Sequence, residues 1–542
     1  MLAKAAGLLT SELTTLRVLT SAGVIRPYPP RVLIGIARTL KHWGRGAAGG
    51  FTTLAQRAPD QVGIIDELGE LTFRQLHERS NALAHSLRGL GVAEGDSVAV
   101  LCRNHRGFVE STIAVSKLGA DVLYLNTAFA APQLGDVCRR ERPAAIIYDE
   151  EFTGLVDRSG IEVSRVLAWV DTDPEGLPTL EQLITAGDTA DLTPPGRRGR
   201  SVILTSGTTG TPKGAPRSEA SFDAGVALLS RLPLRRGWRT HIAAPLFHTW
   251  GWAHLNLAML MGSTMVLRRR FDPEDCLRAV TEHRCDSVVV IPVMLQRILQ
   301  LPEETLARYD LSHVRVVAAS GSALPGDLGT DWMDRFGDNL YNIYGSTEVA
   351  WVTIAQPGDL RAAPGTAGKP PHATVVRLYD GQGAPVPEGE AGRIFVGNSM
   401  LFEGYTEGGS KDVVDDLMCT GDVGRFDPGG RLFVEGRDDD MIVSGGENVF
   451  PQEVEDCLAR HAAVVEAAAV GVHDDDFGKR LRAFVVLAAD MTGQVSDEDL
   501  KEHVKVNLAR YKVPREIVFL PELPRNATGK VLKRELSDEE PS

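Results

Sequence analysis

The chain has 542 residues, of which 43% are apolar and 24% are charged, as in an ordinary globular protein. This length exceeds what one hydrophobic core usually supports, so we expect at least two domains. The 58 basic and 72 acidic residues give a net charge of −14, which argues against a general nucleic-acid binder. The six cysteines show no metal-ligand spacing, and free thiols in a reducing, cytoplasmic compartment are the simplest interpretation.

Residues 1–50 form a basic extension, with seven lysines and arginines against one glutamate. No stretch reaches 18 uninterrupted apolar residues, so no membrane span is predicted, and Glu12 and Arg17 interrupt a signal-peptide pattern. Apolar residues recur at helical spacing among the basic ones, at Leu33, Ile36, Leu40 and Trp43. Two interpretations stay open: a helix packed on the main domain, the usual meaning of such a pattern, or a helix lying on the inner face of an anionic membrane.

The first helix of the main domain is predicted to follow Thr72, because Thr72 and Gln75 form a T-x-x-Q capping box, and to close at Gly89. Short Val- and Ile-rich runs then alternate with amphipathic segments, at residues 97–102, 121–126, 143–149, 165–171, 201–206, 287–293 and 314–320. Continuous apolar runs between amphipathic helices indicate parallel strands covered on both faces. The large N-terminal part is therefore predicted to be α/β.

The pattern of the sequence changes after about residue 370. Short segments in which apolar and polar residues alternate, separated by turns with Gly and Asp, predict an antiparallel β subdomain there. A smaller α+β segment follows, beginning with the helix PQEVEDCLARH. The acidic run Asp438–Asp440 is the predicted boundary. We expect a basic extension (1–50), a large domain of parallel α/β sheets with a β subdomain (51–438), and a small, mobile α+β domain (439–542).

The stretch ILTSGTTGTPKG (203–214) gathers hydroxyls and bare backbone amides around one lysine, directly after an apolar strand. Such donors suit a phosphate cradle, whereas the strand before them disfavours a flexible linker. The spacing is not G-x-x-x-x-G-K-[ST], which excludes the common nucleotide-hydrolase loop. The predicted phosphate-binding residues are Thr205, Ser206, Gly207, Thr208, Thr209, Gly210 and Lys213.

Four more motifs follow in order: YNIYGSTE (341–348), TGD (420–422), GRDDDMIVSGGENVFPQEVE (436–455) and PRNATGKVLKREL (524–536). Through these five motifs the sequence closely resembles the adenylate-forming, AMP-binding superfamily of acyl-CoA synthetases, luciferases and peptide-synthetase adenylation domains, from about residue 50 to 536. The resemblance implies a ligase that uses ATP, Mg²⁺ and CoA to convert a carboxylic acid into an acyl-adenylate and then a thioester. Bringing two anions together demands electrostatic neutralisation and positioning more than acid–base catalysis.

The resemblance also implies roles at the α-phosphate. Thr347 contacts this phosphate, and Glu348 ligates Mg²⁺, a hard cation that suits a carboxylate. Lys530 bridges the substrate carboxylate and the α-phosphate as a point charge on a long stem. A surface acid and an exposed lysine are the alternatives for Glu348 and Lys530, and their motifs favour the catalytic roles.

The nucleoside contacts are implied in the same way. Tyr344 stacks on adenine, Asn342 bonds the adenine amino group, and Asp422 with Arg437 fixes the ribose. The remaining members of this set are Ser320, Gly321, Ser322, Ala323 and Gly345. Because Asp422 follows a glycine, a plain turn residue is the alternative for it.

After adenylation, the small domain is implied to rotate about Asp439 and to close Gly445 and Gly446 over a tunnel for the pantetheine of CoA. The segment PLFHTWGW (245–252) matches the border of the acyl pocket, where His248 orients the carboxylate unless it is only structural. This segment favours a medium- or long-chain fatty acid, or another apolar acid, over an amino acid.

Two departures from fatty-acyl ligases leave the chain length open: DDLMC without tryptophan before TGD, and Glu219 where a histidine is usual. The nearest alternative is a fatty-acyl-AMP ligase that loads a carrier protein, although no extra segment that would restrain the hinge is evident. An ATP-hydrolysing binding module and a catalytically silent lipid binder are more distant alternatives. Whether the chain forms a homodimer is left open.

Overall fold

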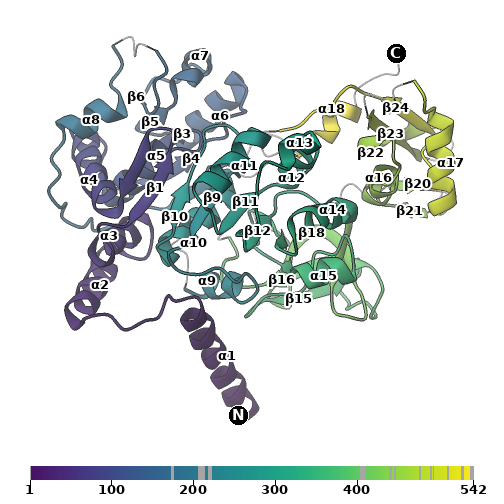
Figure 1. Cartoon of the computed structure of the whole chain (residues 1–542), viewed down its shortest axis with the longest axis horizontal. Coiled ribbons are helices and arrows are strands. Elements are labelled where there is room, and N and C mark those ends of the chain that lie inside the picture. The colour runs from purple at the N-terminus through teal and green to yellow at the C-terminus, as the bar shows by residue number, and fades with distance from the viewer. Residues whose placement is uncertain are drawn as a thin grey trace.

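The protein is described from a computed structural model. The described residues are 2–172, 176–204, 214–217, 222–402, 404, 410–438, 442–444, 447–474, 478–488, 491, 493–508, 512–526 and 530–537. They form two largely parallel sheets, an antiparallel sheet and a small C-terminal domain, preceded by two helices (Figure 1). Across these ranges, no helix has the length and apolar character needed to cross a membrane.

The first sheet is buried on both faces, as the apolar runs of the sequence predict. In spatial order its strands are β6 (Ser164–Leu167), β5 (Ala145–Tyr148), β3 (Ser97–Leu101), β4 (Asp121–Tyr124), β7 (Ser201–Leu204) and β8 (Gly214–Arg217), parallel except for β7–β8. Val98 and Val100 pack into the main core on one face, whereas Ala99 and Leu101 pack into a second core on the other. This alternation confirms the prediction of parallel strands covered on both sides.

Helices from both sides cover this first sheet. They are α3 (Ala47–Arg57), α4 (Phe73–Gly89), α5 (Arg106–Lys117), α6 (Ala131–Glu141), the 3₁₀ turn η1 (Glu150–Phe152), α7 (Thr153–Arg158) and α8 (Leu180–Ala186). The predicted capping box is confirmed at the start of α4: the Gln75 N–H donates to the Thr72 hydroxyl at 3.2 Å, and the Thr72 N–H donates to the Gln75 side chain at 2.8 Å. The helix also ends at Gly89, as predicted.

The second sheet carries the YNIYGSTE motif, which begins on its strand β13. In spatial order its strands are β14 (Thr353–Ala355), β13 (Leu340–Tyr344), β12 (Val316–Ala319), β11 (Ser287–Val290), β9 (Arg239–Ile242), β10 (Thr264–Val266), β1 (Val62–Asp66) and β2 (Gly69–Thr72). Only the two edge pairs, β13–β14 and β1–β2, are antiparallel. Its helices are α9 (Phe222–Leu229), α10 (Thr249–Met261), α11 (Pro273–Glu282), α12 (Pro292–Leu299), α13 (Glu303–Leu306), α14 (Gly326–Phe336) and α15 (Pro357–Ala362).

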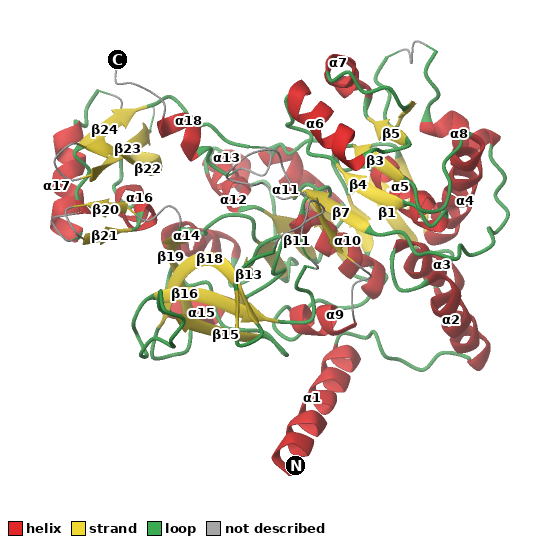
Figure 2. Ribbon diagram, turned by 180° about the vertical axis from the view of Figure 1, so that it is seen from behind, coloured by secondary structure: helices red, strands yellow, loops and turns green. Residues whose placement is uncertain are grey.

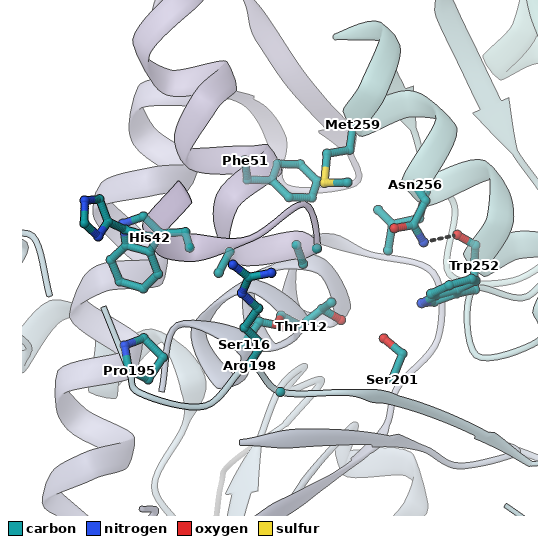
Figure 3. Close-up of a pocket in the computed structure, with 16 residues that line it drawn as sticks. His42, Phe51, Thr112, Ser116, Pro195, Arg198, Ser201, Trp252, Asn256 and Met259 are labelled. Carbon is teal, nitrogen blue, oxygen red and sulfur yellow. Dashed lines mark hydrogen bonds between the residues drawn. The ribbon is translucent and has the colours of Figure 1, made fainter. Parts of the chain in front are cut away.

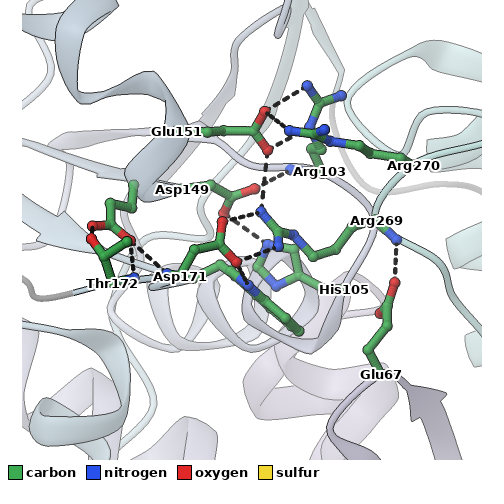
Figure 4. A network of polar contacts seen from close by, with 11 residues as sticks. Glu67, Arg103, His105, Asp149, Glu151, Asp171, Thr172, Arg269 and Arg270 are labelled. Carbon is green, nitrogen blue, oxygen red and sulfur yellow. Dashed lines mark hydrogen bonds and ion pairs between the residues drawn. The ribbon is translucent and has the colours of Figure 1, made fainter.

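An ion-pair network joins the two sheets (Figure 4). Arg269, just after β10, donates to Asp171 at 2.9 Å and to Glu151 at 3.2 Å, and its guanidinium lies 4.4 Å from the ring centroid of Trp169. Glu151 also accepts from Arg103 at 2.6 Å. Because Arg269 belongs to the second sheet and its partners to the first, the network fixes the relative position of the two sheets.

The two remaining parts of the fold are an antiparallel sheet and a small α+β domain, in the order that the sequence predicts. The antiparallel sheet contains β15 (Val375–Tyr379), β16 (Gly392–Gly397), β17 (Val413–Val414), β18 (Leu417–Phe426) and β19 (Leu432–Arg437). The C-terminal domain contains β20 (Ile442–Ser444), β21 (Glu447–Val449), α16 (Pro451–Ala459), β22 (Val464–Asp474), β23 (Gly478–Leu487), α17 (Asp497–Asn507), β24 (Glu516–Phe519) and α18 (Lys533–Ser537). It lies at one end of the molecule, beside the antiparallel sheet (Figure 2).

Helices α1 (Leu2–Ser21) and α2 (Pro30–Trp43) precede the sheets, so the predicted helix over residues 33–43 is confirmed. The apolar face of α2 is only partly covered: Ile36, Leu40 and Trp43 are half-buried, but Leu33 is exposed. All six cysteines are buried and free, as the sequence predicts.

Candidate functional site

The candidate site lies at the carboxyl ends of β12 and β13, two neighbouring parallel strands. Ala319 at the end of β12 pairs with Asn342 of β13, so Ser320 and Tyr344 leave the sheet at the same edge. Ligands of α/β sheets bind outside the carboxyl ends of strands, because loops and helix N-termini converge there. Gly321 adopts φ of +102°, which a residue with a side chain would rarely take.

The antiparallel sheet contributes the two residues expected at the ribose. Asp422 on β18 and Arg437 on β19 are register partners, and their charged atoms lie 3.8 Å apart. The Tyr344 hydroxyl donates to Asp422 at 2.5 Å and lies 3.3 Å from the Thr420 hydroxyl. Burial raises the pKa of Asp422, and the contacts with Tyr344, Arg437 and Lys530 oppose that rise.

The turn after β13 places the two residues expected at the α-phosphate. A Cβ on Gly345 would lie 2.0 Å from the Ala350 carbonyl oxygen, so only glycine fits this turn. The Ser346 hydroxyl donates to the Glu348 carboxylate at 2.9 Å and accepts from the Glu348 N–H at 3.3 Å. Thr347 and Glu348 are both half-buried.

The start of α10 contacts Thr347. The hydroxyls of Thr347 and Thr249 lie 3.0 Å apart, although the residues are 98 positions apart in the chain. Thr249 opens α10, whose N-cap is His248. A Cβ on Gly251 would lie 2.2 Å from the Pro245 carbonyl oxygen, so this glycine lets the helix start close against the preceding loop. The PLFHT segment and the YGSTE turn therefore face each other.

The charge of Lys530 acts on two side chains of the large domain, His248 and Asp422. Burial, with a smaller contribution from the Lys530 charge, lowers the pKa of His248 to about 4. The Lys530 charge also acts on Asp422. The lysine is exposed, and its backbone N–H donates to the Asn526 side chain at 2.9 Å. A lysine of the C-terminal domain therefore acts electrostatically on two predicted site residues of the large domain, whereas its predicted bridge between the substrate carboxylate and the α-phosphate stays a prediction.

The described residues hold thirteen of the predicted site residues. His248, Ser320, Asn342, Tyr344, Thr347, Glu348, Asp422, Arg437 and Lys530 take part in the geometry above, and Gly321, Ser322, Ala323 and Gly345 complete its loops. Ten other predicted positions lie outside the described residues: Thr205, Ser206, Gly207, Thr208, Thr209, Gly210, Lys213, Asp439, Gly445 and Gly446. Their roles stay predictions.

Sequence reasoning missed the contributions of Thr249, Thr420 and Ser346. Each lies inside a motif quoted above. Its place beside a predicted site residue is therefore the one signal in the sequence that could have indicated its contribution. Their roles depend on contacts between motifs, which residue spacing does not reveal.

Cys102, His105 and Asp149 form a separate cluster of ligand-type side chains, each of which has a hydrogen-bond partner. The His105 Nδ1 accepts from the Gly107 N–H at 3.1 Å, and its Nε2 lies 2.8 Å from Asp149. Both imidazole nitrogens are used in positioning the start of α5. We interpret the cluster as structural; Figure 4 shows two of its members, His105 and Asp149.

A cavity lies along α10, between this helix, α5 and the residues that join α2 to α3 (Figure 3). Its wall includes Trp252, one turn after His248, together with Asn256 and Met259. Phe51 and Trp43 close it from the N-terminal side. The cavity is therefore distinct from the nucleotide edge but shares a helix with His248.

Two family models match this chain. The profile described as "AMP-binding enzyme" matches residues 51–406, and "AMP-binding enzyme C-terminal domain" matches residues 453–530. A feruloyl-CoA synthase from Amycolatopsis sp is 34% identical over 489 residues, which cover 89% of this chain and 96% of that protein. A fatty acid–[acyl-carrier-protein] ligase from Streptomyces coeruleorubidus is 29% identical over 510 residues, with coverages of 89% and 94%.

Among solved structures, the anthranilate CoA ligase in complex with anthranoyl-AMP is similar to this chain with a TM-score of 0.81. Its sequence identity is 27%, and the match covers 90% of this chain and 96% of that one. The mixed α/β fold with a small C-terminal domain is therefore shared over nearly the whole length.

Proposed function

Because the chain belongs to the AMP-binding enzyme family, we propose that it is an AMP-forming acid–thiol ligase that joins a carboxylic acid to CoA through an acyl-adenylate. The observation that carries this proposal is that the charge of Lys530, in the C-terminal domain, acts on His248 and on Asp422, which accepts a hydrogen bond from Tyr344. A module that only bound ATP would not need a cation from a second domain beside the loop that borders the acid.

In the first half-reaction, a carboxylate oxygen attacks the α-phosphorus of ATP, and the bond to pyrophosphate breaks with its electron pair. Two negative charges must approach each other, so the residues present act by neutralisation and positioning. Lys530 holds the carboxylate against the α-phosphate, and Thr347, positioned by Thr249, donates to that phosphate. Asp422 and Tyr344 fix the nucleoside.

Glu348 is proposed to hold Mg²⁺. Its carboxylate is half-buried and oriented by the Ser346 hydroxyl, and such an oxygen ligand fits a hard divalent cation. When bound, the cation would neutralise charge on the phosphates. In the second half-reaction, the CoA thiol loses its proton and attacks the acyl carbon, and AMP leaves with one oxygen of the original carboxylate. Rotation about Asp439 and closure over Gly445 and Gly446 are proposed for this step.

We infer that the acid is apolar and aromatic. The feruloyl and anthranilate ligases among the relatives support an aromatic acid, and the neutral His248 fits an acid group without a second charge. A medium- or long-chain fatty acid is the second candidate. It is favoured by the cavity beyond Trp252, because Asn256 lies about 12 Å along α10 from His248 at 1.5 Å per residue. A chain extending past Trp252 would reach it.

The test is to incubate the protein with ATP, Mg²⁺ and CoA and a pooled series of aromatic, fatty and amino acids, and to identify products by mass. We expect aryl-CoA thioesters with an equal amount of AMP. Fatty acyl-CoA as the main product would select the second candidate. Adenylates that accumulate with CoA but disappear with a phosphopantetheinyl carrier protein would identify a carrier as the acceptor. ADP and orthophosphate would contradict the ligase proposal.

A further inference from the structure

The N-terminal arm, defined here as residues 12–43 of α1, α2 and the segment between them, exposes an unusual share of apolar surface. Within the part of the chain that the structure describes, eleven large apolar side chains are exposed, and five of them belong to this arm. They are Leu13 (65% exposed), Leu16 (52%), Ile25 (45%), Leu33 (49%) and Ile34 (53%). Exposed apolar side chains gathered in one segment mark an interaction surface, whereas scattered ones do not.

Basic residues stand beside these apolar side chains. Arg17 lies one helical turn after Leu13, and Arg38 and Lys41 lie one and two turns after Ile34 on the same face of α2. The arm carries five exposed basic residues, Arg17, Arg26, Arg31, Arg38 and Lys41, against Glu12 alone. The whole chain has a net charge of −14, so this basic segment opposes the charge of the rest of the molecule.

Both helices of the arm contact the rest of the protein near their C-terminal ends. Leu19 and Ala22 are buried, and the Arg236 N–H donates to the Ala22 carbonyl at 2.9 Å. In α2, the buried Thr39 exchanges hydrogen bonds with Gln56 of α3. Both helices protrude from the same edge of the molecule, away from the C-terminal domain, in each of the two opposite views (Figures 1 and 2). The profile of the catalytic family begins at residue 51, so the arm lies outside the shared catalytic unit.

We propose that this arm docks the protein on an anionic phospholipid surface. Leucine and isoleucine side chains enter the boundary between headgroups and acyl chains, while arginine and lysine extend to the lipid phosphates. Lipid is favoured over arm-to-arm contact with a second copy, because that contact would bring two basic surfaces together. The acidic body, which an anionic surface repels, is held away from it by the protruding helices.

The test uses the full chain and flotation with vesicles of phosphatidylcholine alone or mixed with phosphatidylglycerol. We expect binding to the mixed vesicles and its loss at high salt. The variant Arg31→Gln/Arg38→Gln/Lys41→Gln should weaken binding on the order of 100-fold, from about fivefold per basic residue at an anionic surface. The variant Leu33→Ser/Ile34→Ser should weaken binding about tenfold or more.

Two matched variants serve as controls. Arg88→Gln/Arg158→Gln/Arg315→Gln makes the same charge change at exposed arginines elsewhere, and Leu68→Ser/Leu90→Ser removes exposed leucines outside the arm. Neither should change vesicle binding, and all four variants should retain thioester formation with a water-soluble acid. The proposal is overturned if the full chain does not float with anionic vesicles or if controls and arm variants behave alike. Sedimentation showing a dimer that the arm variants dissociate, without vesicle binding, would identify a second copy as the occupant instead.

Discussion

The Tyr344 hydroxyl donates a 2.5 Å hydrogen bond to the carboxylate of Asp422, which joins two motifs 78 residues apart. Burial, reinforced by the negative charge of Asp422, raises the pKa of Tyr344 well above its ordinary value, so the phenol keeps its proton. The residue proposed to stack on adenine therefore also positions the residue proposed to hold the ribose. Base and sugar recognition are coupled through one side-chain contact.

The variant Tyr344→Phe should lose this contact and keep the aromatic ring. Because the hydrogen bond lowers the pKa of Asp422, its loss should raise that pKa further and favour the protonated carboxyl. We expect the KM for ATP to rise roughly tenfold, as for a hydrogen bond to a charged group. The rise should be larger at about pH 6 than at about pH 8, since protonation increases as pH falls. Tyr341→Phe, on the same strand, should leave the KM unchanged, and equal effects of the two variants would contradict the coupling.

Lys530→Ala should slow adenylation by two to three orders of magnitude, on the scale of losing one preorganised donor to a developing charge. Pyrophosphate exchange into ATP measures this half-reaction. The second half-reaction, started from a supplied acyl-adenylate and CoA, should change much less, because Lys530 is proposed to act only at the α-phosphate. Lys505→Ala, an exposed lysine paired with Glu502 on the same domain, is the control. Equal losses in both half-reactions would contradict this division of roles.

His248 should be neutral throughout the physiological range, since burial lowers its pKa to about 4. The rate of adenylation should therefore show no inflection from this residue between about pH 5.5 and pH 8. We expect His248→Asn to lower the rate while leaving the shape of the pH profile unchanged. An inflection near the ordinary histidine pKa that disappears in the variant would show that the histidine titrates during catalysis.

Lys117 should make stability depend on pH. Its side chain is 1% exposed and donates to the Ser80 hydroxyl at 2.8 Å and the Asn81 side chain at 2.5 Å, and burial lowers its pKa from 10.5 to about 7. Between these values the unfolded chain binds a proton that the folded chain has released, so the free energy of unfolding should rise with pH across this window. Below about pH 7 both states are protonated, and the full cost of the buried charge remains.

The comparison with Lys117→Met isolates this effect. From about pH 7.5 to pH 9.5, the free energy of unfolding of the unmodified protein should gain about 2 kcal/mol relative to the variant. Urea unfolding at a series of pH values measures the difference. The exposed Lys505→Met should follow the unmodified protein. Parallel curves for Lys117→Met and the unmodified protein would show that the buried lysine keeps an ordinary pKa.

Local sequence patterns predicted those parts of the fold that depend on neighbouring residues. The capping box at Thr72 and the alternation of apolar strands with amphipathic helices are short-range signals, and the structure confirms both. The contact between Thr249 and Thr347, by contrast, links positions 98 apart. Spacing within a motif carries no information about such a contact, because sheet order decides it.

Two other features show the same limit. Arg269 meets Asp171 and Glu151 only because two sheets pack against each other, and nothing in the sequence near Arg269 indicates these partners. On α2, the helical spacing of apolar residues predicts an apolar face that includes Leu33. The rest of the protein, however, covers Ile36 and Leu40 more than it covers Leu33. The helix could be predicted, whereas the part of its face left uncovered depends on the shape of its neighbours.

The most direct test of the adenylate mechanism follows the oxygen atoms of the acid. A substrate acid labelled with ¹⁸O in both carboxylate positions is converted in the presence of ATP, Mg²⁺ and CoA, and the products are examined by mass. Attack of the carboxylate on the α-phosphate leaves one carboxylate oxygen on AMP when the thiol displaces it, so AMP should carry one ¹⁸O and pyrophosphate none. Label found in orthophosphate, with ADP as the nucleotide product, would contradict the mechanism.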